Sequence, residues 1–190
     1  TAVVLLGVTV QASAQPSVDE LKRNVQERSQ KVAEYRALLD DSDRSVRLAA
    51  LDVMLKSDDT AMRALAYEAG FKSSDATMRA VTLKNRVAGL SAIVVEVELR
   101  DNASEGEKKV STKWGGTYAF DKKSFDEKTG TFKTSGKSKS GTGQVVGTTV
   151  QFHQQYCDGS FQLGEGAVLQ GTLGCRSGWE GKFKGTIKLH

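Results

Sequence analysis

The sequence has few of the side chains that build catalytic and metal sites, because its 190 residues include only two histidines and two cysteines. A hydrolase triad needs a buried, oriented histidine. His190 is the terminal residue, and the alternation of His153 with Phe152 predicts that His153 points to solvent. Cys157 and Cys175 lie far from any C-x-x-C motif, and no second pair could complete a zinc site. We therefore expect no metal, no cofactor and no enzymatic activity.

Long hydrophobic runs and a strong net charge are also lacking. The uncharged run at residues 2–10 is too short for a transmembrane helix, which needs about 20 residues. Apolar residues make up 38% of the chain and aromatic residues 7%, which is enough for a modest core but not for a membrane-embedded body. The net charge of +4 is mild, so a nucleic-acid partner is not expected. The length allows one large domain or two small ones.

The N-terminal run resembles a secretory leader. It is followed by Ala12, Ser13 and Ala14, an A-x-A pattern that signal peptidase recognises. We expect residues 1–14 to be a signal peptide remnant and the mature protein to be periplasmic or secreted, with no membrane span after cleavage. The alternative for this run is a buried helix or strand. In an oxidising compartment Cys157 and Cys175 would form a disulfide, worth roughly 3 kcal/mol for a loop of this size.

One phrase occurs three times at a spacing of sixteen residues, as SDRSVRLAALDVMLKS, DDTAMRALAYEAGFKS and SDATMRAVTLKNRVAG. The head of each copy carries an aspartate suited to a helix N-cap, namely Asp43, Asp59 and Asp75. The apolar positions then recur at steps of three to five residues, which is typical of one helix face. Each copy predicts one helix of about a dozen residues and a short turn, and stacking would bury the apolar faces.

The phrase D-x-x-[VM]-R-x-x-A in these copies resembles short HEAT-type repeats, over about residues 40–89 only. No family resemblance is evident in the residues that follow. In HEAT repeats the arginine commonly pairs with acids of a neighbouring repeat. The resemblance therefore implies a structural ladder of Arg47, Arg63 and Arg79, with a ligand site as the alternative.

A further helix is predicted upstream of the repeats. Ser17 and Glu20 have the spacing of a capping box. The apolar residues that follow have heptad spacing, interrupted by Arg28, and are Val18, Leu21, Val25, Val32, Tyr35 and Leu39. We expect this stripe to pack on the repeat helices; the alternative is a homodimer through residues 17–39.

After Gly89 the periodicity changes from helical to alternating. Four runs have this pattern: 93–99, 114–120 with Trp114, Tyr118 and Phe120 on one face, 145–152, and 179–189. Alternating runs separated by glycine-containing turns predict an antiparallel β domain of six or seven strands. Sequence alone leaves a sandwich and a small barrel as alternatives.

Two turns can be placed more closely. The segment DEKTG at 126–130 predicts a hairpin turn with Gly130 in a left-handed conformation. If residues 164–168 form a loop, Leu163 faces Leu169 and Cys157 faces Cys175 across a hairpin. The disulfide would then tie this hairpin from its apolar face.

One cluster of charge suggests a binding surface. Residues 108–139 contain nine lysines and three acids with interleaved aromatics. A cationic surface of this kind would bind an anionic polymer such as cell-wall glycan, lipopolysaccharide or extracellular DNA. The candidate binding residues are Lys108, Lys109, Lys113, Trp114, Lys122 and Lys123. The alternative is that the lysines only keep edge strands soluble.

These observations together predict an exported α+β protein, with a HEAT-like helical region at 16–89 and an antiparallel β sandwich or small barrel at 90–190. We expect a non-catalytic module that binds another macromolecule, either a protein or an anionic polymer. A carboxylate-based hydrolase is the third hypothesis, since Asp126 and Glu127 could supply a carboxylate pair. Adjacent residues on a turn rarely converge on a substrate, which counts against it.

Overall fold

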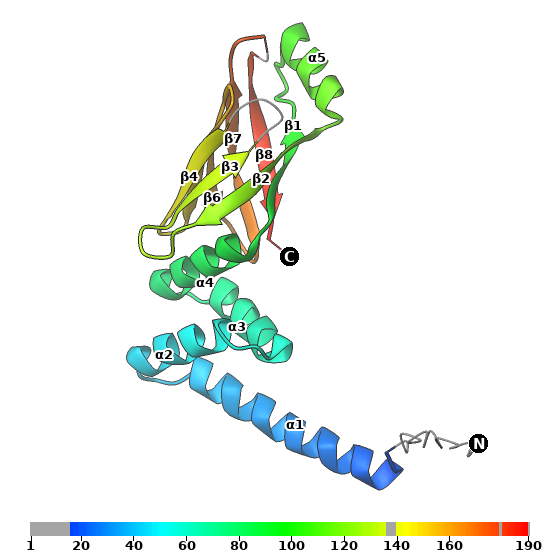
Figure 1. Cartoon of the computed structure of the whole chain (residues 1–190), viewed down its shortest axis with the longest axis vertical. Coiled ribbons are helices and arrows are strands. Elements are labelled where there is room, and N and C mark those ends of the chain that lie inside the picture. Colours follow the sequence, from blue (N-terminus) through cyan, green and yellow to red (C-terminus); the bar gives the residue numbers. More distant parts are fainter. Residues whose placement is uncertain (1–15, 136–139, 179, 190) are drawn as a thin grey trace, which may run out of the picture.

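The computed structural model describes residues 16–135, 140–178 and 180–189, so the expected signal peptide at 1–14 lies outside the described residues. This part of the chain forms five helices and eight strands (Figure 1). The helices are α1 (Val18–Leu39), α2 (Arg44–Leu55), α3 (Thr60–Lys72), α4 (Ala76–Gly89) and α5 (Glu105–Trp114). The strands are β1 (Ala92–Glu98), β2 (Thr117–Phe125), β3 (Thr131–Ser135), β4 (Ser140–Val146), β5 (Thr149–Gln154), β6 (Cys157–Leu163), β7 (Val168–Cys175) and β8 (Gly181–Lys188).

Each sixteen-residue copy forms one helix, which begins directly after its aspartate. The carboxylates of Asp43, Asp59 and Asp75 accept hydrogen bonds of 2.7–2.8 Å from backbone N–H groups of the first turn. These bonds satisfy amides that have no partner within the helix. α1 contacts both α2 and α3, and α2 contacts both α3 and α4, so the helices form a stack in which alternate helices also touch.

The repeated arginines bind backbone carbonyls and not the acids that the HEAT resemblance implies. Arg47 and Arg63 donate to carbonyls of the turn that precedes their own helix. Arg79 instead donates to the carbonyls of Leu163, the last residue of β6, and of Gly164 in the loop that follows it. The third copy thus uses its arginine to join the helical stack to the β strands.

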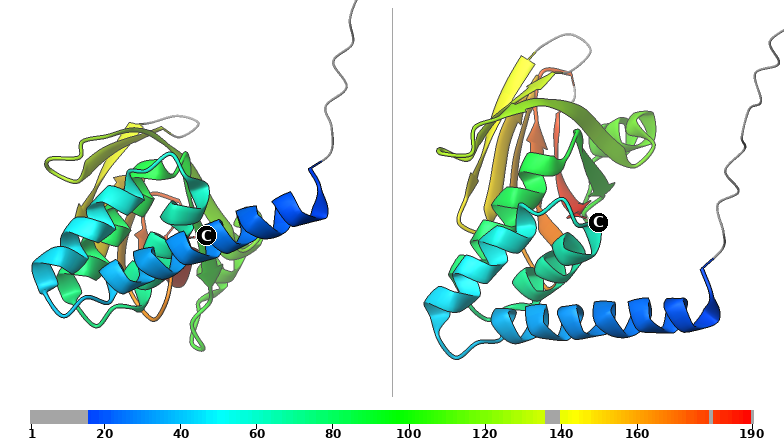
Figure 2. Two further views of the ribbon diagram at one scale, coloured as in Figure 1. Left: turned by 90° about the horizontal axis from the view of Figure 1, so that it is seen from below. Right: turned by 60° about the horizontal axis from the view of Figure 1, so that its bottom comes forward.

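The apolar stripe of α1 is covered only in part. Tyr35 and Leu39 pack in the core of the helical stack, whereas Val18, Leu21 and Val25 are 68%, 55% and 60% exposed. Both views in Figure 2 show the N-terminal part of α1 projecting from the rest of the molecule. The expectation that the whole stripe packs on the repeat helices is therefore correct for its C-terminal half and wrong for its N-terminal half.

The strands form a closed barrel, so the expected sandwich is wrong. The described residues form eight strands, not six or seven. Each strand pairs antiparallel with the next, and β8 returns to pair with β1. Closure leaves no free sheet edge among these eight strands, which is the physical advantage of this architecture over an open sheet.

The strand count was too low because residues 145–152 form a hairpin instead of one strand. Gly147 and Thr148 make a two-residue turn between β4 and β5, with Gly147 at φ +56°. Glycine adopts this conformation without steric cost, as the first position of such a turn requires. Val145 and Val150 therefore pair across the hairpin, and both are buried.

The expectation that residues 90–190 form only β structure is wrong, because helix α5 lies between β1 and β2. Trp114, expected on a strand, is the last residue of this helix. Ser104 and Glu107 form a capping box at its start, a pattern that the sequence contains. The buried Glu107 carboxylate accepts hydrogen bonds from the backbone N–H groups of Lys182 and Ser104 and from the Arg100 side chain. These donors lower the pKa of Glu107 to about 2 and fix α5 to β8.

The barrel interior is a packed aromatic core. Five buried phenylalanines point inward, namely Phe120, Phe132, Phe152, Phe161 and Phe183. Glycines on neighbouring strands make room for the rings: a Cβ at Gly143 would lie 2.1 Å from the Phe132 ring, and one at Gly159 would lie 2.3 Å from the Phe152 ring. Leu83 of α4 belongs to the same core, and α4 lies across one end of the barrel (Figure 1). Large and small residues therefore fill the barrel as in other small closed barrels.

The register predicted for the hairpin of β6 and β7 is confirmed. Cys157 pairs with Cys175 and Leu163 with Leu169, and the two sulfurs form a disulfide of 2.02 Å. The connecting loop is 164–167, one residue shorter than expected, because Val168 already pairs with Lys188 in β8. Gly130, in the turn at 126–130, has the predicted left-handed conformation, with a φ of +72°.

Candidate functional site

The six candidate binding residues do not form one surface. Lys108, Lys109, Lys113 and Trp114 belong to α5, at the end of the barrel opposite to α4 (Figure 1). The Trp114 ring packs on Tyr118 and Phe183, with centroid distances of 5.0 and 5.2 Å. The sequence cluster is therefore divided between a helix and a strand.

The other two lysines lie on β2, towards the helical stack. The ammonium of Lys122 donates to the carbonyl of Ala88 at the end of α4, at 3.0 Å. Partial burial lowers the pKa of Lys122, because removal from water disfavours the charged form. Lys123 is exposed and forms an ion pair with Asp121 at 3.3 Å. Lys122 thus acts as a link between the helical stack and the barrel.

An open depression of ≈ 810 Å³ lies on the outer face of β2–β6. Outward side chains from β3, β4, β5 and β6 line it in two rows set by the strand register. The first row is Lys133, Thr142, His153 and Asp158, and the second is Thr131, Gln144, Gln151 and Ser160. Neighbouring side chains in each row are about 4.8 Å apart, the usual strand spacing. We call this depression with its two rows the outer groove.

The backbone between the two rows forms the floor of the outer groove. Four residues on adjacent strands pair there, and their Cα–Cβ directions point into the barrel: Phe132, Gly143, Phe152 and Gly159. The Phe132 and Phe152 rings are buried beneath this backbone. A packed aromatic layer under the floor makes the groove a rigid surface, since protein interiors have low compressibility.

At one end of the outer groove, the Asp158 carboxylate forms hydrogen bonds with two side chains. His153 Nδ1 lies 2.6 Å from Asp158 Oδ1, and Arg176 lies 3.3 Å from the other oxygen of Asp158. The side chains of His153 and Asp158 are 48% and 55% exposed, so the histidine faces solvent as its alternation predicted. A solvated pair of this kind orients an imidazole for hydrogen bonding but lacks the burial of a catalytic triad.

Several side chains in the groove have unused hydrogen-bonding capacity. Within the described segments, the side chains of Thr142, Gln151, Ser160 and Lys133 form no hydrogen bond to the protein. Threonine, serine and glutamine can each donate and accept. The outer groove therefore offers mixed donors and acceptors, with few charges, over four strands.

The carboxylates give no support to a hydrolase. Asp126 accepts from the backbone N–H groups of Thr129 and Lys128, and these bonds lower its pKa. Every carboxyl pKa that shifts among residues 16–135, 140–178 and 180–189 is lowered, whereas a general acid needs a raised one. The same segments contain no group of three or more side chains able to hold a metal ion.

Comparisons of this chain with protein families, with curated proteins and with solved structures found no match. None of the helices in the described residues has the length and apolar character needed to cross a membrane. The candidate site therefore rests on the geometry of the outer groove itself.

Proposed function

We propose that this protein is a non-catalytic binding module of the periplasm or cell exterior, and that the outer groove binds an extended, hydroxyl-rich polymer of the glycan type. The observation that carries the proposal is the pair of side-chain rows, with unused donors and acceptors, on a rigid floor. The disulfide between Cys157 and Cys175 is compatible with an exported protein.

The chemistry of the two rows favours a neutral ligand over an anionic one. The lining of the groove contains one lysine, Lys133, and two aspartates, Asp126 and Asp158, so the groove has no excess of positive charge. Hydroxyl groups both donate and accept, as do the serine, threonine and glutamine side chains that line the second row. Because four strands span about 14 Å at the usual spacing and the depression is open, a polymer could lie across them.

The barrel interior supports the choice of an outer surface. Small closed barrels either enclose a ligand or are filled by side chains. Here the phenylalanine rings occupy the interior, and the ring of Phe161 is fully buried at the centre of the core. A ligand would therefore have to bind on the outside of the barrel.

Affinity electrophoresis against dextran, xylan and laminarin tests this function. The wild-type protein should be retarded by at least one neutral polysaccharide, with little dependence on salt. Gln151→Ala should weaken binding about five- to tenfold, the usual worth of one hydrogen bond. Gln170→Ala is the matched control, because Gln170 is an exposed glutamine on β7 that lies outside the outer groove. No retardation by any of the three, or an equal effect of both variants, would contradict the proposal.

A second candidate is an anionic polymer bound by α5. The lysines of α5 are exposed on a helix that projects at the end of the barrel (Figure 1). Retention on heparin or lipopolysaccharide that falls with salt, and falls further in Lys108→Gln with Lys109→Gln, would favour this function. Lys122→Gln is its control, because Lys122 bonds to Ala88 and does not lie on α5. Retention reduced only by the control substitution would exclude α5 as the site.

A further inference from the structure

A second depression, of ≈ 380 Å³, lies where the helical stack meets the barrel. Tyr67, Phe71 and Arg86 of α3 and α4 line it, together with Ala167 from the loop at 164–167 and Leu189, which directly follows β8. The end of β8 lies beside these helices in every view of the ribbon (Figures 1 and 2). Small-molecule sites are frequent at junctions of this kind and usually have a volume of about 300–1,000 Å³. We call this depression the junction pocket.

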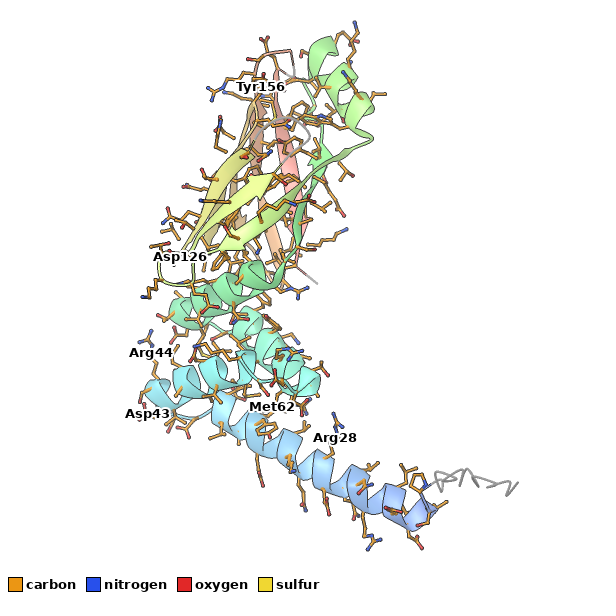
Figure 3. All side chains as sticks on the ribbon, in the orientation of Figure 1. Arg28, Asp43, Arg44, Met62, Asp126 and Tyr156 are labelled. Carbon is orange, nitrogen blue, oxygen red and sulfur yellow. A yellow bond between two sulfur atoms is a disulfide. The ribbon has the colours of Figure 1, made fainter. Side chains whose placement is uncertain are left out.

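The junction pocket is separate from the outer groove, with which it shares no lining residue. Asp126, which lines the outer groove, is labelled in Figure 3 at the hairpin between β2 and β3. In the same orientation β8 ends beyond the other end of α4 (Figure 1). A ligand of the junction pocket would therefore be independent of a polymer in the outer groove.

Aromatic rings form one wall of the junction pocket. Tyr67 and Phe71 lie one turn apart on α3, and their rings are stacked with a centroid distance of 6.2 Å. Phe71 is buried in the barrel core, whereas Tyr67 is half-buried and donates from its hydroxyl to Asn85 Oδ1 at 2.6 Å. Because both rings are held by these contacts, a ligand that packs on this wall loses little affinity to their ordering.

Hydrogen bonds hold the wall that belongs to the barrel. The backbone N–H of Leu189 donates to the carbonyl of Ala167 at 2.9 Å, and the N–H of Gly164 donates to the carbonyl of Val168 at 2.9 Å. Arg79 also bonds to two carbonyls at the start of this loop. Loops are usually the more mobile parts of a fold, so these bonds help to keep the pocket in one shape.

The guanidinium of Arg86 is the main charged group of the junction pocket. Its Nε–H donates to the carbonyl of Leu189 at 2.6 Å, and its central carbon lies 5.5 Å from the centroid of the Tyr67 ring. Within residues 16–135, 140–178 and 180–189, no carboxylate forms an ion pair with Arg86. The side chain is half-buried, and its two terminal nitrogens carry N–H donors that the bond to Leu189 does not use.

The other charges of the lining do not compensate Arg86. Lys72 and Glu68 both line the pocket, but they form an ion pair with each other at 2.8 Å. The hydrogen bond from Lys72 lowers the pKa of Glu68, so this acid is charged at neutral pH. The lining therefore contains two cations and one acid. Glu165, in the adjoining loop, is exposed and is not part of the lining.

We propose that the junction pocket binds a small carboxylic acid with an apolar body. The carboxylate accepts hydrogen bonds from the terminal nitrogens of Arg86, whose planar guanidinium matches two oxygens at once. The apolar body covers the Tyr67 ring and the side chains of Ala167 and Leu189. The volume of ≈ 380 Å³ suits a single ring with a short acid chain.

Titration of the isotopically labelled full chain with phenylpropionate, followed by NMR, tests the site. We expect saturable shifts at the backbone N–H groups of Gly166 and Ala167 and at Nε–H of Arg86, with a dissociation constant of about 1 mM or tighter. Phenylpropanol has the same ring without the carboxylate and should bind at least about tenfold more weakly, since charged hydrogen bonds are lost. No saturable shift at these groups up to about 10 mM phenylpropionate, or equal affinity for the alcohol, would overturn the proposal.

One substitution tests the charge. Arg86→Gln should weaken the binding of phenylpropionate at least about tenfold and that of phenylpropanol about twofold or less. Arg47→Gln is the matched control, because Arg47 is a half-buried arginine that also bonds to backbone carbonyls but lies outside the junction pocket. Phenylpropionate affinity that is unchanged in Arg86→Gln, or reduced equally in both variants, would overturn the role of Arg86.

A second substitution tests the apolar part of the site without removing a hydrogen bond. Ala167→Phe places a ring in the junction pocket and should abolish the binding of both compounds. Ala103→Phe is its control, since Ala103 is a half-buried alanine of another loop, outside the pocket. Melting curves show that each variant is folded at the temperature of the titration. Undiminished binding to Ala167→Phe would place the ligand elsewhere and overturn the proposal.

Discussion

The ring of Phe152 occupies the space that a side chain at Gly159 would need. The two residues are directly paired between β5 and β6. The three nearest atoms to a Cβ built at Gly159 all belong to the Phe152 ring, at 2.3, 2.5 and 2.7 Å. Phe152 in turn packs on Phe161 and Phe120, with centroid distances of 5.8 and 4.8 Å. Its ring therefore cannot move without disturbing two further rings.

This geometry predicts a strong coupling between two substitutions. Gly159→Ala alone should cost about 1–3 kcal/mol of unfolding free energy, because the added methyl group overpacks the core. Phe152→Ala alone should cost about 3–5 kcal/mol through the cavity that it leaves. In the double variant the methyl group enters that cavity, and Gly159→Ala should then stabilise by about 0.4–1 kcal/mol through the unfolded state. The coupling energy is thus about 1.5–4 kcal/mol.

Urea denaturation of the wild type, both single variants and the double variant measures this coupling, if the disulfide is kept oxidised throughout. The slope of unfolding free energy against urea should be the same in all four proteins. Near-ultraviolet circular dichroism should show whether the aromatic core remains ordered. Additive effects within about 0.5 kcal/mol would refute the packing of the Phe152 ring over Gly159.

Three further predictions concern the ends of the barrel. Backbone N–H groups and an arginine hold the pKa of Glu107 at about 2, below its ordinary 4.5. The stability that this carboxylate contributes is therefore present above about pH 4.5 and is lost as the pH falls towards 2. Glu107→Gln should show a smaller fall of melting temperature between pH 5 and about 2. Replacement of Cys157 and Cys175 by serine should lower the unfolding free energy by about 3 kcal/mol, from a sequence separation of 18, as urea titration can measure. Arg79→Ala removes the bonds to the loop at 164–167 and should speed amide hydrogen exchange there, with no change in β2 and β3.

The features that sequence predicts well are those with a strict local period. The register from Cys157 to Leu163 follows from the two-residue alternation of a strand once the loop is placed, and the disulfide follows from the register. The helix starts at Asp43, Asp59 and Asp75 follow from capping chemistry, which involves only neighbouring residues. Local rules suffice for these elements.

Barrel closure depends on the pairing of the first and last strands, which local sequence patterns do not predict. β1 and β8 pair through Glu96 and Thr186, which are ninety residues apart, and nothing in either strand marks it as the partner of the other. The hairpin at Gly147 is hard to predict because apolar residues continue on both sides of the turn. The buried residue before the turn is Val145 and the one after it is Val150, so the alternation passes from odd to even residue numbers. The alternation of Trp114 with Tyr118 and Phe120 favours a strand and conceals the end of α5, although Ser104 and Glu107 have the spacing of a capping box.

The outer groove could be predicted only in part. Alternation predicts that Gln151 and His153 point outward, and the structure places both on the outside of β5. Gln151 and His153 share a surface with Thr142 and Ser160 because β4, β5 and β6 pair in one register. The sequence does not predict this pairing. The lysine cluster was the stronger signal in the sequence, but the fold divides it between α5 and β2.

We propose that the ligand binds on the outside of the barrel, because side chains fill its interior. Chemical-shift mapping of the isotopically labelled protein, titrated with a polysaccharide that retards it, tests this most directly. We expect shifts at the outward residues Thr131, Gln144, Gln151 and Ser160, and none at the ring protons of the buried Phe161. Shifts concentrated on the interior rings, with the four outward residues unchanged, would contradict it.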